Sequence, residues 1–368
     1  MKEMDVSVFI PIYRESTHLA DILNVLVSQE IEKEIFVLLD EPTEYSLRIL
    51  KRFRTVKFVV NENRVGKAEA LNKAVELSCG RILLFLDADI AIPSDSGFLE
   101  RIVNMMSDTD LLDIKKEVIN ESFLSKMSYY EYVGFNIGSW LLSKVIKRCP
   151  AVNGAAFAIR KDVFDSLQGF RRVLSEDLDL ALRAFVKNYK FDYTKEVKVY
   201  NYVHSTWQKW IVQRRRWAIG AALWLKEYCK DLVKISARRP QVYVPALFLL
   251  FPSLTLILSS FFVPDLFIHR LFSLLLIFLA VRFSFIIPVL ILITLSINVF
   301  KSVLFTLTSF FTFSTLFFIF SKKLEFKFKI HEFFIYYFFY SLLSLLIMVT
   351  GILEVFILDK RTVSDWKV

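Results

Sequence analysis

Two aspartates separated by a single residue, Asp87 and Asp89, follow a run of apolar residues at positions 83–86. In an extended segment, side chains two positions apart point to the same side, so both carboxylates face one ligand. Carboxylate oxygens suit a hard cation such as Mg²⁺ or Mn²⁺, which in turn binds a diphosphate. An acid-x-acid triplet alone is more often a solvated turn, but its position after an apolar strand favours a metal site.

A second pair of carboxylates, Glu176 and Asp177, precedes a helical pattern at residues 178–188. A carboxylate at the start of a helix can act as a general base for a hydroxyl group. The alternative is a plain helix start, in which Ser175 caps the backbone and the acids interact favourably with the helix dipole.

Asp40 and Lys67 offer groups that can bind the rest of a nucleotide. Asp40 follows a predicted strand, where its carboxylate can accept hydrogen bonds from a base or a ribose, or it is a turn residue before Pro42. Gly66 and Lys67 open a helix, which brings backbone amides and a positive charge close to a phosphate. The competing explanation is an ordinary loop-to-helix turn.

A basic and aromatic segment, Gln-Arg-Arg-Arg-Trp at residues 213–217, lies within a helical pattern that starts near residue 203. Guanidinium groups bind phosphate, and an indole ring offers a flat face to a sugar. The same helix carries one stripe of tryptophans at Trp207, Trp210, Trp217 and Trp224. The stripe predicts an amphipathic helix in the headgroup region of a membrane, or else a helix whose tryptophans pack on a soluble core.

The elements that must position these residues alternate along the first hundred residues. Short apolar, β-branched runs at 6–12, 34–39, 56–60 and 82–86 alternate with helical patterns at 16–29, 45–53 and 67–79. This rhythm predicts a parallel sheet with helices on both faces. Such sheets bind ligands at the carboxyl ends of their strands, which is where the predicted fold places Asp40, Asp87 and Asp89.

The composition separates this domain from an apolar one. The chain has 368 residues, and because 55% of them are hydrophobic, a disordered protein is excluded. Its three cysteines are too few for a disulfide framework. Its formal charge of +9 comes from short basic clusters near apolar runs, a pattern that favours contact with membrane lipids over nucleic acid.

Charge becomes sparse after residue 242, and the apolar stretches there are long enough to cross a bilayer. They lie at residues 243–263, 271–300, 302–320 and 333–358. We count four spans, or five if Arg282 lies at a turn. The sequence predicts an integral protein of the cell membrane whose first domain is cytoplasmic. Lysines after residue 321 favour a cytoplasmic loop between the third and fourth spans, and this conflicts with four spans and a cytoplasmic start.

Taken together, the motifs resemble those of membrane-bound family 2 glycosyltransferases, which include cellulose, hyaluronan and chitin synthases and ceramide glucosyltransferase. The family series D, DxD, (T/S)ED and QxxRW is matched in order by Asp40, Asp87-x-Asp89, Glu176-Asp177 and Gln213-x-x-Arg216-Trp217. The opening VFIPIYRE at 8–15 and the segment VNGAAFAIR at 152–160 are also similar to family patterns. Glu41-Pro42 and Arg14 depart from the usual residues.

The resemblance implies a GT-A (Rossmann-like) α/β domain followed by an α-helical transmembrane domain, and inverting transfer from a UDP- or GDP-sugar. Asp177, with Glu176 beside it, would be the catalytic base, and Asp89 with Asp87 would bind Mg²⁺ or Mn²⁺. Residues implied to bind the nucleotide sugar are Pro11, Tyr13, Glu15, Asp40, Lys67, Asp87 and Arg216. Residues implied to bind the acceptor are Gln213, Trp217 and Gly154.

The predicted domains are a cytosolic GT-A domain at 1–202 and an amphipathic interfacial helix with a linker at 203–242. A transmembrane domain of about four helices at 243–358 and a tail at 359–368 follow. With few spans for a polymer channel, a lipid or lipid-linked glycan acceptor is favoured. The alternatives are a processive polysaccharide synthase, a dolichyl-phosphate sugar synthase and a non-catalytic membrane scaffold.

Overall fold

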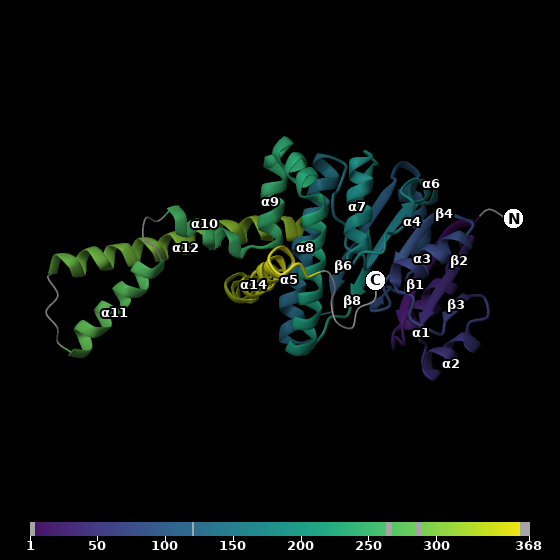
Figure 1. Ribbon diagram of the computed structural model, residues 1–368, viewed down its shortest axis with the longest axis horizontal. Coiled ribbons are helices and arrows are strands. Elements are labelled where there is room, and N and C mark those ends of the chain that lie inside the picture. The colour runs from purple at the N-terminus through teal and green to yellow at the C-terminus, as the bar shows by residue number, and fades with distance from the viewer. Residues whose placement is uncertain (1–3, 120, 263–266, 284–288, 361–368) are drawn as a thin grey trace. The chain divides into compact units, whose positions relative to one another are not determined.

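The computed structural model describes residues 4–119, 121–262, 267–283 and 289–360 (Figure 1). The chain forms two compact units. The first contains residues Met1–Ala246 and Leu346–Val368, and the second contains Leu247–Leu345. The first unit carries every residue that the sequence predicts to do chemistry.

A mixed eight-stranded sheet runs through the first unit in the order β3-β2-β1-β4-β7-β6-β8-β5 (Figure 1). The strands β3, β2, β1 and β4 are parallel, as predicted, whereas β7 is antiparallel to both β4 and β6. The strand bounds are β1 Met4–Tyr13, β2 Lys33–Asp40, β3 Lys57–Asn61, β4 Gly80–Leu86, β5 Ile90–Ala91, β6 Leu111–Val118, β7 Ala156–Arg160 and β8 Phe191–Asn201.

Helices cover both faces of this sheet, which confirms the predicted layers. One face of the sheet packs on α1, α2 and α4 through a cluster that includes Val8, Leu23 and Ile102. On the other face, Phe9 stacks between Phe36 and Phe85 with ring centroids 5.2 Å apart in each pair. Because both faces are buried, the strands read as nearly continuous apolar runs.

The five helices predicted in the first unit, α1, α2, α3, α7 and α8, begin within a few residues of their predicted starts, whereas α4, α5 and α6 were not predicted. Their bounds are α1 Leu19–Val27, α2 Glu44–Arg52, α3 Lys67–Glu76, α4 Phe98–Met105, α5 Phe123–Val145, α6 Lys161–Ser166, α7 Glu176–Val186 and α8 Trp207–Arg238. A 3-10 turn, η1, covers Met106–Asp108. The later helices are α9 Pro240–Leu250, α10 Ser253–Phe262, α11 Phe267–Phe283, α12 Val289–Lys323, α13 Ile330–Ile335, the π-helix η2 Tyr336–Tyr340, and α14 Ser341–Phe356.

The tryptophan stripe of α8 does not face lipid as one surface. Trp210 has none of its surface exposed, so it packs inside the protein, whereas Trp207 at the start of the helix is 45% exposed. The prediction of a stripe lying wholly at a membrane surface is therefore wrong for Trp210. The alternative, packing on the soluble core, is the arrangement found there.

The end of α14 belongs to the first unit and packs on α8. Gly351 makes this contact possible, because a Cβ atom at this position would lie 2.7 Å from the Cβ of Ala218 and 2.8 Å from its carbonyl carbon. Val355 is fully buried against α8, and Arg215 pairs with Glu354 at 2.8 Å. The first unit is thus completed by a segment about a hundred residues further along the chain.

Two helical segments of the described residues are long and apolar enough to cross a membrane, Val299–Lys323 and Ile330–Phe356. The predicted span at 302–320 forms the later part of α12, and the span at 333–358 falls mainly in the second segment. The predicted spans at 243–263 and 271–300 include positions 263 and 284–288, which lie outside the described residues. The count of four spans therefore stays a prediction.

We expect opposite effects from the same substitution at two helical glycines. Gly351→Ala should destabilise the protein by about 1–3 kcal/mol, because the new methyl group overlaps the backbone of α8. Gly138→Ala on α5 should be neutral or stabilising by up to about 1 kcal/mol, since its Cβ would meet no atom within 4 Å. Thermal unfolding of both variants in detergent checks this, and equal effects would contradict the α8–α14 contact.

Candidate active site

The acidic turn Asp87-Ala88-Asp89 follows β4, next to the carboxyl end of β1, where the order of the sheet changes direction. Ligands of open α/β sheets bind at this point. Three hydrogen bonds hold the turn: Asp87 N–H to the carbonyl of Ala155 (2.9 Å), the Ser16 hydroxyl to the carbonyl of Ala88 (2.5 Å), and Tyr202 N–H to the carbonyl of Asp89 (2.9 Å). The two carboxylates therefore project from a fixed backbone.

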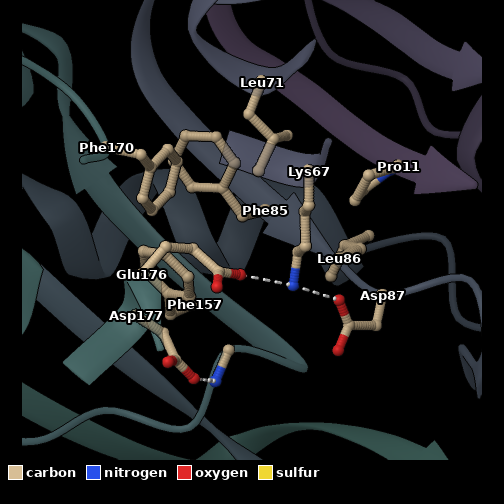
Figure 2. A pocket seen from close by; sticks show the side chains of 11 residues that line it. Pro11, Lys67, Leu71, Phe85, Leu86, Asp87, Phe157, Phe170, Glu176 and Asp177 are labelled. Atoms are coloured by element: carbon tan, nitrogen blue, oxygen red, sulfur yellow. Dashed lines mark hydrogen bonds and ion pairs between the residues drawn. The ribbon is translucent and has the colours of Figure 1, made fainter. Parts of the chain in front are cut away.

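Lys67 joins the two predicted pairs of carboxylates. Its Nζ lies 2.9 Å from Asp87 Oδ1 and 3.0 Å from Glu176 Oε1, as Figure 2 shows. Burial alone would lower the pKa of Lys67, but the charges of Asp87, Glu176 and Asp177 raise that pKa well above its ordinary value. The amine is therefore a permanent cation at the start of α3, and it holds the acidic turn close to the start of α7.

Asp177 is fixed by two backbone amides. Its Oδ2 accepts a hydrogen bond from Gly154 N–H at 2.8 Å, and its Oδ1 accepts one from Leu178 N–H at 2.8 Å. Gly154 is needed for this approach, since a Cβ there would lie 2.8 Å from Asp177 Oδ2. Burial and then the charge of Glu176 raise the pKa of Asp177 to about 6.

The helix start around Asp177 differs from the plain cap that the sequence also allowed. Ser175 occupies the cap position of α7, but its side chain makes no capping hydrogen bond. Gly154, implied by the resemblance to bind the acceptor, instead donates to the carboxylate of the predicted base. Both findings indicate that this turn is built to hold Asp177.

Asp89 has an exposed side chain at the rim of the site, although much protein surrounds its carboxyl group. Removal of water by the surrounding protein and then the charge of Asp87 raise the pKa of Asp89 to about 7, against the opposing charges of Lys67 and Arg216. A carboxyl group that holds its proton this firmly lacks compensating positive charge. Together with the carboxylate of Asp87, two residues earlier on the same turn, Asp89 can offer oxygen ligands to a divalent cation, so the residues fit the predicted metal.

The described residues contain no group of three or more His, Cys, Asp and Glu side chains placed to hold a metal ion. A cation at Asp87 and Asp89 would therefore need further oxygen ligands from a bound molecule or water. The diphosphate oxygens of a nucleotide supply such ligands.

Arg216 brings a second cation to the site from α8. Burial lowers the pKa of Arg216, and the charges of Glu176, Asp87, Asp89 and Asp177 oppose that decrease. The predicted Gln213-Arg216-Trp217 motif thus contributes its arginine to the carboxylates. Gln213 and Trp217 are partly buried on the same helix and lie outside the residues that line the pocket in Figure 2.

Asp40 binds the protein's own backbone in this structure. Its buried carboxylate accepts hydrogen bonds from the Asn61 side chain (2.8 Å), from Val65 N–H (3.3 Å) and from Gly66 N–H (3.0 Å). Gly66 has a φ of 99°, which favours glycine, and Lys67 follows it directly. Asp40 therefore shapes the loop that delivers Lys67, an arrangement that neither sequence interpretation included.

The remaining predicted residues divide between the pocket and its outer surface. Pro11 lines the pocket with Lys67 and Asp87. Tyr13 lies further out, where its ring is 4.2 Å from the guanidinium carbon of Arg64 and its hydroxyl donates to Glu41 at 3.1 Å. Glu15 accepts a hydrogen bond from the Thr43 hydroxyl at 2.7 Å.

Two residues that support the acidic turn, Ser16 and Tyr202, were not predicted from the sequence. Tyr202 follows β8 and stacks on His18, with ring centroids 3.8 Å apart. Its position beside Asp89 depends on the pairing of β5 with β8, which is remote in sequence. A local pattern carries no signal for such a pairing.

The fold is an α/β sheet, and at the carboxyl ends of its parallel strands Lys67 pairs with Asp87 and with Glu176. The family model for glycosyl transferase family group 2 matches residues 82–351. The chain therefore belongs to this family, as the motifs predicted.

The protein is similar to the probable glycosyltransferase YdaM of Bacillus subtilis, with 26% identity over 65% of this chain and 60% of that protein. It is also similar to the probable glucomannan 4-beta-mannosyltransferase 14 of Arabidopsis thaliana, with 27% identity over 56% of this chain and 43% of that protein. The chain thus spans less than two thirds of the length of these relatives.

Among solved structures, the mannosyltransferase PcManGT of Pyrobaculum calidifontis, in complex with GDP-Man and Mn²⁺, has a TM-score of 0.54. The two chains share 16% identity over 84% of this chain and 87% of that one. This likeness confirms the predicted GT-A fold.

We expect the raised pKa of Asp177 to appear in the pH dependence of stability. Between about pH 4 and pH 6 the folded state keeps a proton that the unfolded state releases, so stability falls as the pH rises through this range. The loss from this one group should be a few kcal/mol. Asp177→Asn removes this titrating carboxyl group, so the stability of the variant should depend less on pH. Parallel curves for both proteins would contradict the assigned pKa.

Proposed function

We propose that the protein transfers a sugar from a nucleotide-sugar donor to an acceptor hydroxyl, with inversion at the anomeric carbon. The observation that carries this proposal is Asp177, a carboxylate with a pKa of about 6 that two backbone amides hold beside the Asp87-Lys67-Glu176 cluster. A base with this pKa is ionised at neutral pH yet still binds a proton well.

In the proposed reaction, Asp177 takes the proton of the acceptor hydroxyl while its oxygen attacks the anomeric carbon. The new glycosidic bond forms as the bond between that carbon and the diphosphate oxygen breaks, and the electron pair leaves with the nucleoside diphosphate. Attack from the side opposite the leaving group inverts the anomeric configuration. Lys67 and Arg216 supply positive charge for the phosphates and limit the repulsion among the carboxylates.

Asp89 and Asp87 would hold Mg²⁺ or Mn²⁺, which when bound neutralises negative charge on the diphosphate. The raised pKa of Asp89 supports this assignment. Glu176 acts through Lys67, because its carboxylate pairs with the amine 3.0 Å away. Its role is to hold that amine close to the base.

Several relatives are named as known or probable glucomannan 4-beta-mannosyltransferases, so a mannosyl donor such as GDP-mannose is the first candidate. The two apolar segments, Val299–Lys323 and Ile330–Phe356, support action at a membrane. The proposal includes a catalytic unit on the cytoplasmic side and a lipid or lipid-linked glycan as acceptor. In this proposal α8 links the domain at 1–202 to the membrane part. The alternative acceptor is a growing polysaccharide.

The deciding experiment gives purified protein in lipid radiolabelled GDP- and UDP-sugars with Mn²⁺ or Mg²⁺ and membrane extract. Label in the lipid-extractable fraction supports a glycolipid product, and label in a high-mass fraction supports polymerisation. Absence of both transfer and nucleotide binding with every donor would overturn the proposed function in favour of a non-catalytic scaffold.

We expect Asp177→Asn to abolish transfer while nucleotide binding stays close to that of the wild type, because only the proton acceptor is lost. Loss of a general base costs roughly 10²–10⁴-fold in rate. Glu176→Gln should reduce transfer less, since it weakens one of two ion pairs of Lys67. Transfer assays with calorimetry of nucleotide binding check both variants, and full turnover by Asp177→Asn would remove it from the proposed role.

We expect Asp89→Ala to lose the part of nucleotide affinity that depends on Mn²⁺. The matched control is Asp108→Ala, because the Asp108 side chain is 92% exposed, pairs with Lys190 and has no part in the proposed site. Titration of the nucleoside diphosphate with and without Mn²⁺ gives the measurement. An unchanged metal dependence in Asp89→Ala would show that the cation binds elsewhere.

A further inference from the structure

Three consecutive arginines on α8 contact three different parts of the first unit. Arg214 pairs with Glu131 of α5, and Arg215 pairs with Glu354 of α14 at 2.8 Å. Arg216 interacts with the carboxylates of the site. Consecutive residues of an α-helix are rotated by 100°, so these contacts together fix how α8 is turned about its axis.

The pair of Arg214 and Glu131 is the buried member of this set. Their side chains are 4% and 7% exposed, and the guanidinium of Arg214 donates to the carboxylate of Glu131. The guanidinium carbon also lies 4.1 Å from the ring centroid of Trp217 and 5.4 Å from that of Trp210. One planar cation therefore contacts the indole of the predicted acceptor motif and a fully buried indole of the core.

The neighbour of Glu131 on α5 is influenced by charges from both α8 and the acidic turn. Tyr132, the neighbour of Glu131 on α5, is buried, and burial raises its pKa. The charge of Arg214 opposes this increase, whereas the charge of Asp89 adds to it. The segment Glu131–Tyr132 thus lies within electrostatic reach of both α8 and the proposed metal ligand.

Stability alone does not explain a charge pair in this position. Removing two charges from water is costly, and apolar residues of similar shape often stabilise a protein equally well. The planar guanidinium, however, can bind a carboxylate at its edge while its faces stack on aromatic rings, which imposes one geometry on its neighbours. An apolar replacement fills the same volume without that directional control.

We propose that Arg214 and Glu131 are positioning residues that hold Trp217 and Arg216 in the orientation needed for sugar transfer. This inference rests on the proposed function for its catalytic meaning, but the orientation of Trp217 can be measured without any substrate. Neither residue contacts the reacting atoms in this scheme. Arg214 acts through Trp217 and through the rotation of α8.

The test uses the full chain in lipid nanodiscs, labelled with 5-fluorotryptophan. The chain has six tryptophans, and the fluorine resonance of Trp217 is assigned by its loss in Trp217→Phe. Two variants are compared with the wild type. Arg214→Lys keeps the charge without the planar group, and Glu131→Leu with Arg214→Met replaces the buried pair by apolar side chains.

We expect both variants to shift or broaden the Trp217 resonance while thermal unfolding of the double variant stays within a few degrees of the wild type. Binding of GDP or UDP with Mn²⁺, whichever the wild type binds, should weaken about tenfold as Arg216 moves. Turnover should fall about 10²-fold, the effect of a displacement near 1 Å. An unchanged Trp217 resonance in both variants would overturn the proposal.

The matched control is Asp113→Leu with Lys116→Met, which removes another buried pair whose side chains are 5% and 3% exposed, in β6. This control should leave the Trp217 resonance unchanged. A shift equal to that of the α8 variants would mean a general loosening and would also overturn the proposal. If the wild type binds no nucleotide, the proposed function fails, and the resonance still decides whether the pair positions Trp217.

Discussion

Four carboxylates, those of Asp87, Asp89, Glu176 and Asp177, lie within electrostatic reach of Lys67 and Arg216. Among the described residues this leaves more negative than positive charge in a place partly shielded from water, where like charges repel strongly. The raised pKa values of Asp89 and Asp177 express that imbalance. The sheet, α3, α7 and α8 each contribute one part of this arrangement, so their relative placement matters more than any single side chain.

The order of motifs in the sequence was sufficient to predict the family, the fold and the residues that meet around Lys67. Carboxylates at strand ends and helix starts are visible in sequence because position along an element determines where a side chain can point. The contacts of Asp40 and Gly154 were not predictable in the same way. Each contact depends on a backbone amide that only folding brings close. Every residue except proline has such an amide, so the sequence does not tell which amide a carboxylate will meet. The tryptophan stripe of α8 was ambiguous because core and membrane both bury indoles.

The loop that Asp40 holds connects the two ends of the site. Tyr13, Asp40 and Asn61 are partners across the parallel strands, so the row they form at the sheet edge is set by register. From this row the chain turns through Gly66 to Lys67, whose amine contacts the acids beside the base. The ends of β2 and β3, whose residues a motif comparison would take only as nucleotide-binding, therefore also help to position Lys67 beside the proposed catalytic carboxylates.

The contact of α14 with α8 has a consequence for the order in which the protein is made. Ribosomes deliver the chain from its amino end, so α8 emerges long before residues 346–356 exist. Until then the surface around Ala218 and Ile219, which Gly351 and Val355 later cover, has no partner from α14. The first unit can therefore reach its final form only after the intervening apolar helices have been synthesised, late in translation.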